Sequence, residues 1–182
     1  MDNMSKMVEA RIPIEAQQTT LAKLGWVSLR EHISDGVEPM VFKPGNPRRV
    51  IESNLLFYVY AKETRLSGRS LMCLSLAELV AVVFGELEDF RGSVLTGVTP
   101  KHLYSLDAIA VSSFCDTGDT FLTNVQRYTV ASFLLTLMRS GKRVILGLDA
   151  FRHLDAWWPT QLTAYVAKNG TVILSGGATE DE

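Results

Sequence analysis

The residue order indicates an α/β fold, a three-layer sandwich in which a mostly parallel five-stranded sheet lies between two layers of helices. Short, continuously apolar runs alternate with longer segments whose apolar residues recur at helical spacing, which is the pattern of β-α-β units. Such units require parallel strands and right-handed crossovers. The chain has 182 residues, of which 47% are hydrophobic. It is therefore long and apolar enough to bury the core of one such domain.

The first 50 residues differ from the remainder. They hold four of the six prolines, namely Pro13, Pro39, Pro44 and Pro47. We expect short helices over residues 15–24 and 26–32, and then an extended piece that leads into a turn, over residues 41–47. The chain is therefore predicted to have two parts, an N-terminal arm (residues 1–50) that packs on the core or on a neighbour, and a core domain (residues 51–182).

Five apolar runs are predicted to form the strands of the sheet: residues 54–60, 93–95, 107–113, 143–148 and 171–174. The first run, NLLFYVY, is apolar and aromatic without a break, which is typical of a strand that is buried on both faces. It would be the first strand of the core.

Three helices are predicted between these strands, over residues 70–84, 121–140 and 159–168. The first contains Leu, Ala and Val almost all round and should be deeply packed. The second has the clearest pattern, and Gly141 marks its end at the position of a helix C′ residue. Its apolar residues lie at i, i+3, i+4, i+7 and i+8, namely Val130, Phe133, Leu134, Leu137 and Met138.

Composition excludes several classes of protein. A net charge of −2 excludes a globally basic nucleic-acid coat, although it allows a local basic patch. Cys73 and Cys115 have no second Cys or His at ligand spacing, so neither a disulfide framework nor a structural zinc site is expected. Residues 1–14 lack the apolar segment of a targeting peptide, and the apolar run 71–84 is too short to span a membrane. We therefore expect a cytoplasmic protein with no membrane partner.

The loop after the first predicted strand is a candidate phosphate-binding loop, because ligands bind at the carboxyl ends of parallel strands. Gly68, Arg69 and Ser70 align with the second half of GxxxxGK[ST]. In that motif loop amides wrap the phosphates, the lysine reaches the outer phosphates and the hydroxyl holds the metal. Glu63 stands at the first glycine position and would bring negative charge near phosphate. The other interpretation is an ordinary surface loop capped by Ser67 or Ser70.

The end of the strand predicted over residues 107–113 is the second candidate. Ser112 and Ser113 stand where an acidic pair would hold magnesium, and they lack the charge of good magnesium ligands. Asp116 follows on the loop and is the candidate residue for a nucleotide's metal ion. Turn formation and capping of the next helix are its alternative role. No catalytic residue and no resident metal site are predicted.

The succession of NLLFYVY, GRS, LDAIAVSSF and QRYTVASFLLTLMRSGKRVILGL resembles the core of P-loop NTPases. It is most similar to the helicase-loader and transposition-helper ATPases of the AAA+ type, over about residues 50–176. The resemblance implies a P-loop-NTPase-like sheet. It also implies that Gly68, Arg69 and Ser70 match phosphate-loop positions, whereas Glu63 and Ser112 depart from the pattern of an enzyme that hydrolyses ATP.

Two further sets of residues are candidate contacts to macromolecules. Arg48 and Arg49 precede the first predicted core strand, and Arg65 follows it. These arginines are candidate phosphate contacts for nucleic acid, with solubilising charge as the alternative. Trp157 and Trp158 are adjacent, so they cannot both face the core from one helix, and at least one should be partly exposed. We predict that they contact a protein partner.

Together these features predict a non-hydrolysing, P-loop-like binding or assembly module, active in DNA replication or mobile-element processes. It would bind no cofactor and would act through a protein partner, either a second copy of itself or another chain, with nucleic acid as a further partner. The alternative is an active, helicase-loader-like NTPase that binds ATP and Mg²⁺ through Gly68, Arg69, Ser70 and Asp116. A third alternative is an unrelated Rossmann-like enzyme, although the sequence contains no nucleophile–base pair for one.

Overall fold

A computed structural model describes residues 11–86, 95, 97–114, 122–149 and 157–176. The strands in these ranges are β1 (Met40–Pro44), β2 (Leu71–Ser75), β3 (Ala108–Ser112), β4 (Arg143–Gly147) and β5 (Thr171–Ser175). The α-helices are α2 (Ile14–Gln18), α3 (Leu29–Asp35), α4 (Val50–Leu66), α5 (Leu76–Phe84), α6 (Pro100–Ser105), α7 (Asn124–Arg139) and α8 (Thr160–Asn169). A short 3-10 helix, η1 (Pro47–Arg49), precedes α4.

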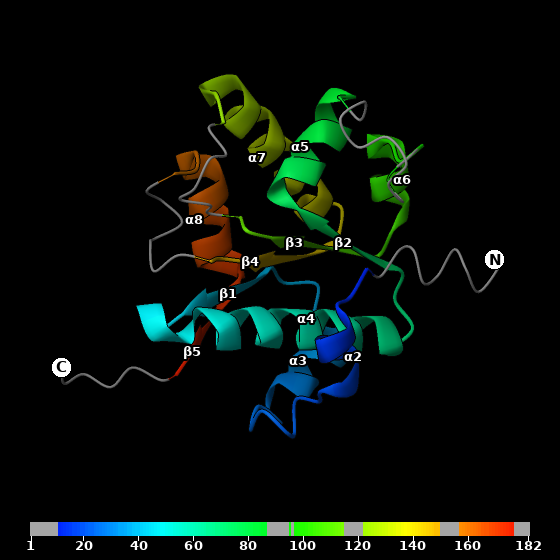
Figure 1. Ribbon diagram of the computed structural model, residues 1–182. Helices are drawn as coiled ribbons and strands as arrows, with labels where there is room; N and C mark the ends of the chain where they lie inside the picture. The colour runs from blue at the N-terminus through cyan, green and yellow to red at the C-terminus, as the bar shows by residue number, and fades with distance from the viewer. Residues whose placement is uncertain (1–10, 87–94, 96, 115–121, 150–156, 177–182) are drawn as a thin grey trace.

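The five strands form one sheet in the order β2-β3-β4-β1-β5, and every pairing is parallel. Helices α2, α3 and α4 cover one face, while α5, α6, α7 and α8 lie over the other (Figure 1). The predicted three-layer α/β sandwich with a five-stranded parallel sheet is therefore confirmed.

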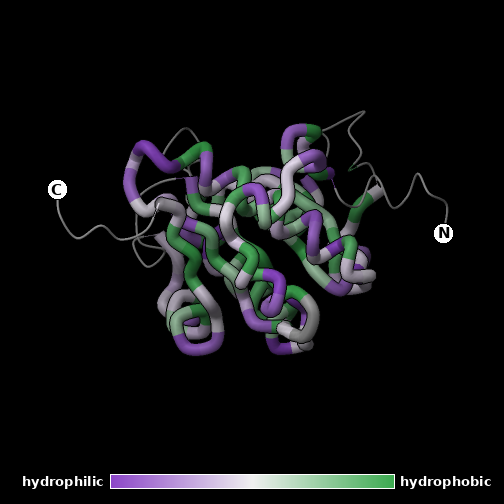
Figure 2. Tube along the Cα trace, turned by 90° about the horizontal axis from the view of Figure 1, so that it is seen from below, coloured by the Kyte–Doolittle hydropathy of each residue, from purple (hydrophilic) through white to green (hydrophobic). Residues whose placement is uncertain are grey.

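The core has two parts, one on each face of the sheet. On the α4 face, Phe42 of β1 packs against Phe57 and Tyr60 of α4, with ring centroids 6.2 Å and 5.2 Å apart. On the opposite face, apolar side chains of α5, α7 and α8 pack over β3 and β4. Hydrophobic stretches run through the middle of the molecule, and hydrophilic stretches lie mainly at its outer turns (Figure 2).

The second half of the chain follows the sequence closely. β3, β4 and β5 confirm the strands predicted over residues 107–113, 143–148 and 171–174. α7 and α8 confirm the helices predicted over residues 121–140 and 159–168. Most of the strand predicted over residues 93–95 lies outside the described residues, and Leu95 itself is in a turn.

The strand predicted over residues 54–60 is wrong, since these residues form the middle of α4. α4 is 17 residues long and buries Leu56, Phe57, Tyr60, Ala61 and Thr64 on the face that meets the sheet. A seven-residue apolar run fits a buried strand and a buried helix equally well, and only the length of the element distinguishes them. The distinguishing signal was the absence of Gly and Pro from residues 48–67.

The single helix predicted over residues 70–84 is also wrong, because the segment divides into β2 and α5 at Ser75. The Ser75 hydroxyl accepts a hydrogen bond from the Glu78 amide at 3.2 Å, and the Glu78 carboxylate accepts one from the Ser75 amide at 2.8 Å. This reciprocal capping box starts a helix at Leu76, so the preceding apolar residues are free to extend as a strand.

The extended piece predicted over residues 41–47 overlaps β1, which begins one residue earlier and lies between β4 and β5 in the sheet. The predicted N-terminal arm therefore contributes a strand to the sheet. Its helices α2 and α3, predicted over residues 15–24 and 26–32, are shorter or begin later and pack beside α4. The predicted boundary between residues 50 and 51 falls where the chain enters α4, directly behind β1 and η1.

Candidate functional site

The carboxyl edge of the sheet holds the candidate site, because parallel α/β sheets bind ligands there. β1 lies inside the sheet, and it passes through residues 45–49 into α4. This β1–α4 connection is the strand-to-helix junction at which a P-loop protein carries its phosphate loop. The ends of β3, β4 and β5 lie at the same edge, because all strands run in one direction.

The side chains of the β1–α4 connection differ from those of a phosphate loop. Residues 45–52, GNPRRVIE, fill the eight positions of GxxxxGK[ST] when Gly45 takes the first one. Ile51 then stands at the lysine position, and it is 84% exposed. Glu52 stands at the Ser/Thr position, and its carboxylate pairs with the Arg49 guanidinium at 2.8 Å. An aliphatic side chain cannot hold an outer phosphate, and a carboxylate at the next position repels it.

Three backbone amides of this connection are already engaged. The Gly45 amide donates to the Ser175 carbonyl at 2.9 Å, and the Arg48 amide donates to the Asn46 side-chain oxygen at 3.0 Å. The Arg49 amide donates to the Asn46 carbonyl at 3.0 Å. Pro47 has no N–H. Since a phosphate loop wraps its ligand with unengaged amides, these residues do not form such a cradle.

The connection does carry positive charge. Arg48 is exposed, and the Arg49 side chain lies against Gly176, where a Cβ would stand 2.8 Å from the Arg49 Cγ. The Ser175 hydroxyl donates to the Arg49 carbonyl at 3.2 Å, so the connection is fastened to the end of β5. Both guanidinium groups lie beside the first turn of α4, where charge and the helix dipole favour anions, although Glu52 pairs with that of Arg49.

Hydroxyl groups occupy the end of β3. The Ser112 hydroxyl donates to the Leu74 carbonyl at 3.5 Å, and Ser113 has a left-handed backbone with φ of 54°. Burial raises the pKa of the half-buried Tyr58 on α4, and its hydrogen bond with Ser112 lowers it, with a net rise. This corner of the edge is therefore uncharged at Ser112 and Tyr58. Asp116, the predicted metal-binding residue, lies outside the described residues.

The placement predicted for Gly68, Arg69 and Ser70 is wrong, because they join a helix to a strand, α4 to β2, at the amino edge of the sheet. The Arg69 guanidinium donates to the Gly36 carbonyl at 2.7 Å. The Ser70 amide and hydroxyl donate to the Asp107 carboxylate at 2.8 and 2.9 Å, and these bonds lower the pKa of Asp107. The stretch therefore ties neighbouring loops together, on the edge opposite the β1–α4 connection.

The two tryptophans have different environments. Trp158 is buried, stacks on Phe114 with centroids 4.2 Å apart, and donates from Nε1 to the Phe114 carbonyl at 3.0 Å. Trp157 is partly exposed, and the Arg127 guanidinium lies 5.2 Å above its ring. The prediction that at least one of the pair is partly exposed is confirmed. Contact with a partner stays a prediction.

The predicted nucleic-acid residues do not form one patch. Arg48 and Arg49 lie in η1 at the carboxyl edge, whereas Arg65 lies in the last turn of α4. Helical rise over α4 separates the two positions by roughly 24 Å. The sequence reasoning missed residues 45–52 as the candidate loop, although a signal existed. Gly45 lies three residues after an apolar stretch, Met40–Phe42, and a long segment without Gly or Pro begins at Arg48.

The described residues contain no group of three or more His, Cys, Asp or Glu side chains that could hold a metal ion. In the same residues, no helix has both the length and the apolar character that crossing a membrane requires.

No protein-family model matches the chain, and no curated protein matches it. Solved structures do. A DNA replication initiation factor is 15% identical with a TM-score of 0.55, over 94% of this chain and 50% of that one. AMPPCP-bound DnaA from Aquifex aeolicus is 13% identical with a TM-score of 0.58, over 90% of this chain and 51% of that one. DnaI is 12% identical with a TM-score of 0.58, over 92% of this chain and 93% of that one.

The chain spans about half the length of the first two of these proteins and nearly the whole length of the DnaI structure. At such identities the likeness concerns the fold. The mixed α/β architecture and the all-parallel five-stranded sheet match it. The chain therefore has a P-loop-NTPase-like fold, as the sequence predicted.

Proposed function

We propose that the protein is a non-hydrolysing, P-loop-like binding or assembly module of DNA replication that acts inside the cell. The observation that carries the proposal is the β1–α4 connection, which has the position of a phosphate loop but lacks its lysine and its Ser/Thr, and in which three backbone amides are engaged within the protein. Likeness in fold to a DNA replication initiation factor and to DnaI supports the process. Mobile-element processes, the other setting that the sequence predicts for this module, stay a prediction.

Thermal unfolding with and without ATP and Mg²⁺ tests the first part of the proposal. We expect no shift in Tm, because the connection offers no cradle for a triphosphate. The alternative, an active NTPase that binds ATP and Mg²⁺, predicts about 2.7 kcal/mol of added stability when ATP is present at 100 times its Kd. A shift of that size contradicts the non-hydrolysing module.

Two matched variants locate any nucleotide that does bind. Arg49→Ala changes the carboxyl edge, and Arg69→Ala changes the amino edge. If ATP raises Tm and only Arg69→Ala removes the rise, the loop is the one predicted from GxxxxGK[ST] at Gly68, Arg69 and Ser70. If only Arg49→Ala removes it, nucleotide sits at the β1–α4 connection.

Nucleic acid is the proposed ligand of Arg48 and Arg49. Both guanidinium groups lie at the exposed start of α4, whereas Arg65 is a helix length away. Fluorescence anisotropy with single- and double-stranded DNA at two salt concentrations should show affinity that falls with salt. Arg48→Ala should weaken binding to all DNA sequences and reduce the salt slope by about 1, with Arg65→Ala as the matched control. Affinity that ignores salt contradicts this assignment.

A protein partner is the third part of the proposal. Trp157 reaches the surface beside Arg127, and tryptophan and arginine are the residues most enriched where binding energy concentrates. The partner is a second copy of the chain or another protein. Size-exclusion chromatography with light scattering distinguishes a homo-oligomer from a monomer that awaits another chain.

A further inference from the structure

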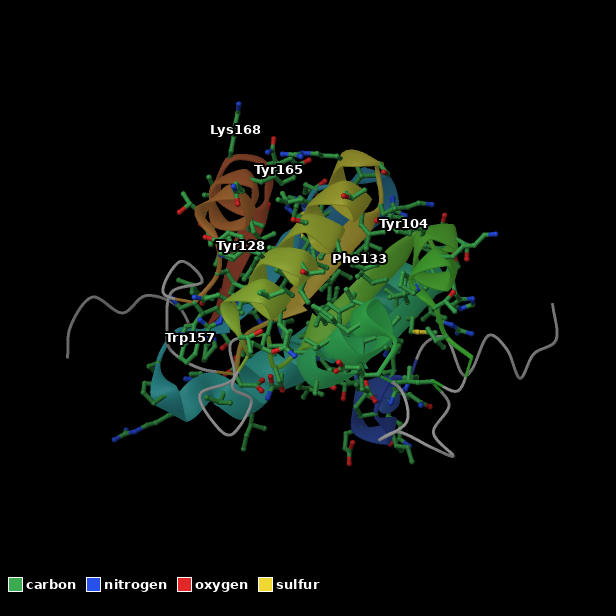
Figure 3. The ribbon with its side chains drawn as sticks, turned by 90° about the horizontal axis from the view of Figure 1, so that it is seen from above. Tyr104, Tyr128, Phe133, Trp157, Tyr165 and Lys168 are labelled. Carbon is green, nitrogen blue, oxygen red and sulfur yellow. The ribbon has the colours of Figure 1, made fainter. Side chains whose placement is uncertain are left out.

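Three of the four helices that lie over the sheet face opposite α4, namely α6, α7 and α8, are positively charged, although the whole chain has a net charge of −2. Helices α6, α7 and α8 contain no Asp or Glu. Their cationic side chains, apart from histidine, are Lys101, Arg127, Arg139 and Lys168. α7 and α8 pack side by side in this layer, and aromatic side chains accompany them along their outer side (Figure 3).

At each end of the α7–α8 pair, an arginine guanidinium lies over an aromatic ring. The Arg127 guanidinium lies 5.2 Å from the centroid of Trp157, and the Arg139 guanidinium lies 5.9 Å from the centroid of Tyr165. Both rings pack against the apolar core. Among the described residues no carboxylate lies within ion-pair distance of Arg127 or Arg139. We call the surface formed by these four residues with Val125 and Tyr128 the α7–α8 face.

Stacking fixes what this face can bind. A guanidinium that lies over the π-face of a ring still has N–H donors for another ligand, and they form a planar fork suited to carboxylate or phosphate. Trp157 and Tyr165 are held between the core and a guanidinium, so they do not present an open ring to a nucleobase, as single-strand binding requires. The face therefore favours carboxylate groups over stacked bases.

The exposed apolar and aromatic side chains of α7 lie at its Arg127 end, whereas its exposed residues between Tyr128 and Arg139 carry hydroxyl groups, namely Thr129, Ser132 and Thr136. Val125 is 67% exposed and Tyr128 is 57% exposed. Tyr, Trp and Arg together are the composition of the energetically dominant centre of protein interfaces. Helical rise places Arg127 and Arg139 roughly 18 Å apart, so one helical segment would need about three turns to meet both.

We propose that the α7–α8 face binds an acidic, amphipathic protein segment, whose carboxylates meet Arg127 and Arg139 and whose apolar stripe covers Val125 and Tyr128. It rests on the protein partner of the proposed function and states what kind of segment that partner presents. It does not depend on whether the β1–α4 connection binds nucleotide.

The test uses fluorescence anisotropy of a labelled helical peptide of about three heptads. The peptide has a leucine stripe flanked by Glu, and a twin has Lys in place of every Glu. The full-length protein should bind the Glu peptide and ignore the Lys twin. Arg127→Glu with Arg139→Glu should weaken binding at least about tenfold, since each charge then faces a like charge.

A matched control changes the same amount of charge on the opposite layer. Lys23→Glu with Arg30→Glu alters two exposed cations beside α2 and in α3, and should leave the affinity unchanged. Arg127→Lys with Arg139→Lys keeps the charge and removes the planar forks, so it should lose affinity while Tm is preserved. It also provides the test if the Glu variant does not fold.

Several results would overturn the proposal. They are no binding of the Glu peptide, equal binding of the Lys twin, or an equal loss in the control variant. Two others point to different occupants. One is binding of oligothymidylate of about 20 nucleotides by the wild type in place of the peptide. If the Arg127 and Arg139 variants do not bind it, the occupant is nucleic acid. Self-association of the wild type that these changes abolish would identify a second copy.

Discussion

At the scale of single residues, the most consequential side chain is Arg143 at the start of β4. Its guanidinium is fully buried and donates to the His32 carbonyl at 2.6 Å, the Ile33 carbonyl at 3.3 Å and the Tyr60 hydroxyl at 3.1 Å. A carboxylate oxygen of Glu38 lies 3.7 Å away. Burial lowers the pKa of Arg143 and raises that of Tyr60 to about 12. This one side chain joins the end of α3 to α4 and to the sheet.

Replacing Arg143 by Met should reduce the free energy of unfolding by about 3–5 kcal/mol. The methionine fills the volume but leaves the Ile33 carbonyl and the Tyr60 hydroxyl without the Arg143 donor, and leaves the His32 carbonyl only the Tyr60 hydroxyl at 3.5 Å. Urea denaturation measures the change, and Arg139→Met on the surface of α7 is the control. A loss below about 1 kcal/mol would mean that water or a rearranged loop replaces the guanidinium.

Glu78 gives the stability a defined dependence on pH. Burial alone would raise its pKa, but hydrogen bonds from Arg11, at 2.6 and 2.7 Å, and from Ser75 lower it below the ordinary 4.5. Because folding lowers the pKa of Glu78, its carboxylate stabilises the folded state at pH values above its pKa in the unfolded chain. This stabilisation is lost as the pH falls through the pKa of Glu78 in the folded protein. Glu78→Gln should therefore cost about 1–3 kcal/mol at pH 7.

The difference in free energy of unfolding between the wild type and Glu78→Gln should shrink as the pH falls below 4.5. The wild-type carboxyl then becomes neutral, as the glutamine amide is at every pH. Glutamine retains the capping box, so the variant isolates charge from capping. Denaturation at a series of pH values checks this. A difference that stays constant with pH would place the effect outside the ion pair with Arg11.

At the scale of elements, helix starts determine how the apolar runs are divided. Ser75 with Glu78 begins α5, and Thr123 with Gln126 begins α7, each through a complete capping box. These short polar signals separate strand from helix inside a run that hydrophobicity alone cannot divide. α4 lacks a side-chain cap and instead follows η1 directly.

Thr123→Ala should destabilise the protein by about 1 kcal/mol, because the Gln126 amide loses its acceptor at the start of α7. Thr129→Ala, two turns further along the exposed side of α7, is the matched control and should change stability little. Thermal or urea denaturation of the two variants measures the cap. Equal effects would mean that helix propensity, and not capping, is being measured.

At the scale of the whole molecule, β1 joins the edge strand β5 to the other three strands of the sheet. It is hydrogen-bonded to β4 on one side and to β5 on the other. Met40 and Phe42 are fully buried on the α4 face. Removing β1 would leave β5 without a neighbour, so the sheet depends on a strand from the first 50 residues.

Residues 51–182 alone should therefore fail to fold cooperatively. The fragment lacks β1, exposes the strand edges of β4 and β5, and loses the apolar cover of Phe57 and Tyr60. Circular dichroism melting and an amide-correlation NMR spectrum test this against the full chain. A sigmoidal melt with dispersed amide signals would show that the predicted core domain is a folding unit of its own.

Residue order alone established the α/β class, three of the five strands, helices α7 and α8, and partial exposure within the tryptophan pair. Each of these features depends on a local signal, such as periodicity, a cap or a glycine. Residues close together in the sequence are sufficient to produce such a signal. The sequence also contained every residue of the β1–α4 connection, but its apolar runs at 54–60 and 70–84 fitted helix and strand alike.

Long-range pairing resolved those runs. β1 is a strand of the sheet because β4 and β5, more than 90 residues further along the chain, bond to both of its edges. Once β1 is placed, α4 must follow it, and the candidate loop moves from Gly68 at the amino edge to Gly45 at the carboxyl edge. Contacts between residues this distant leave no trace in a local pattern, so the position of the site emerged from packing.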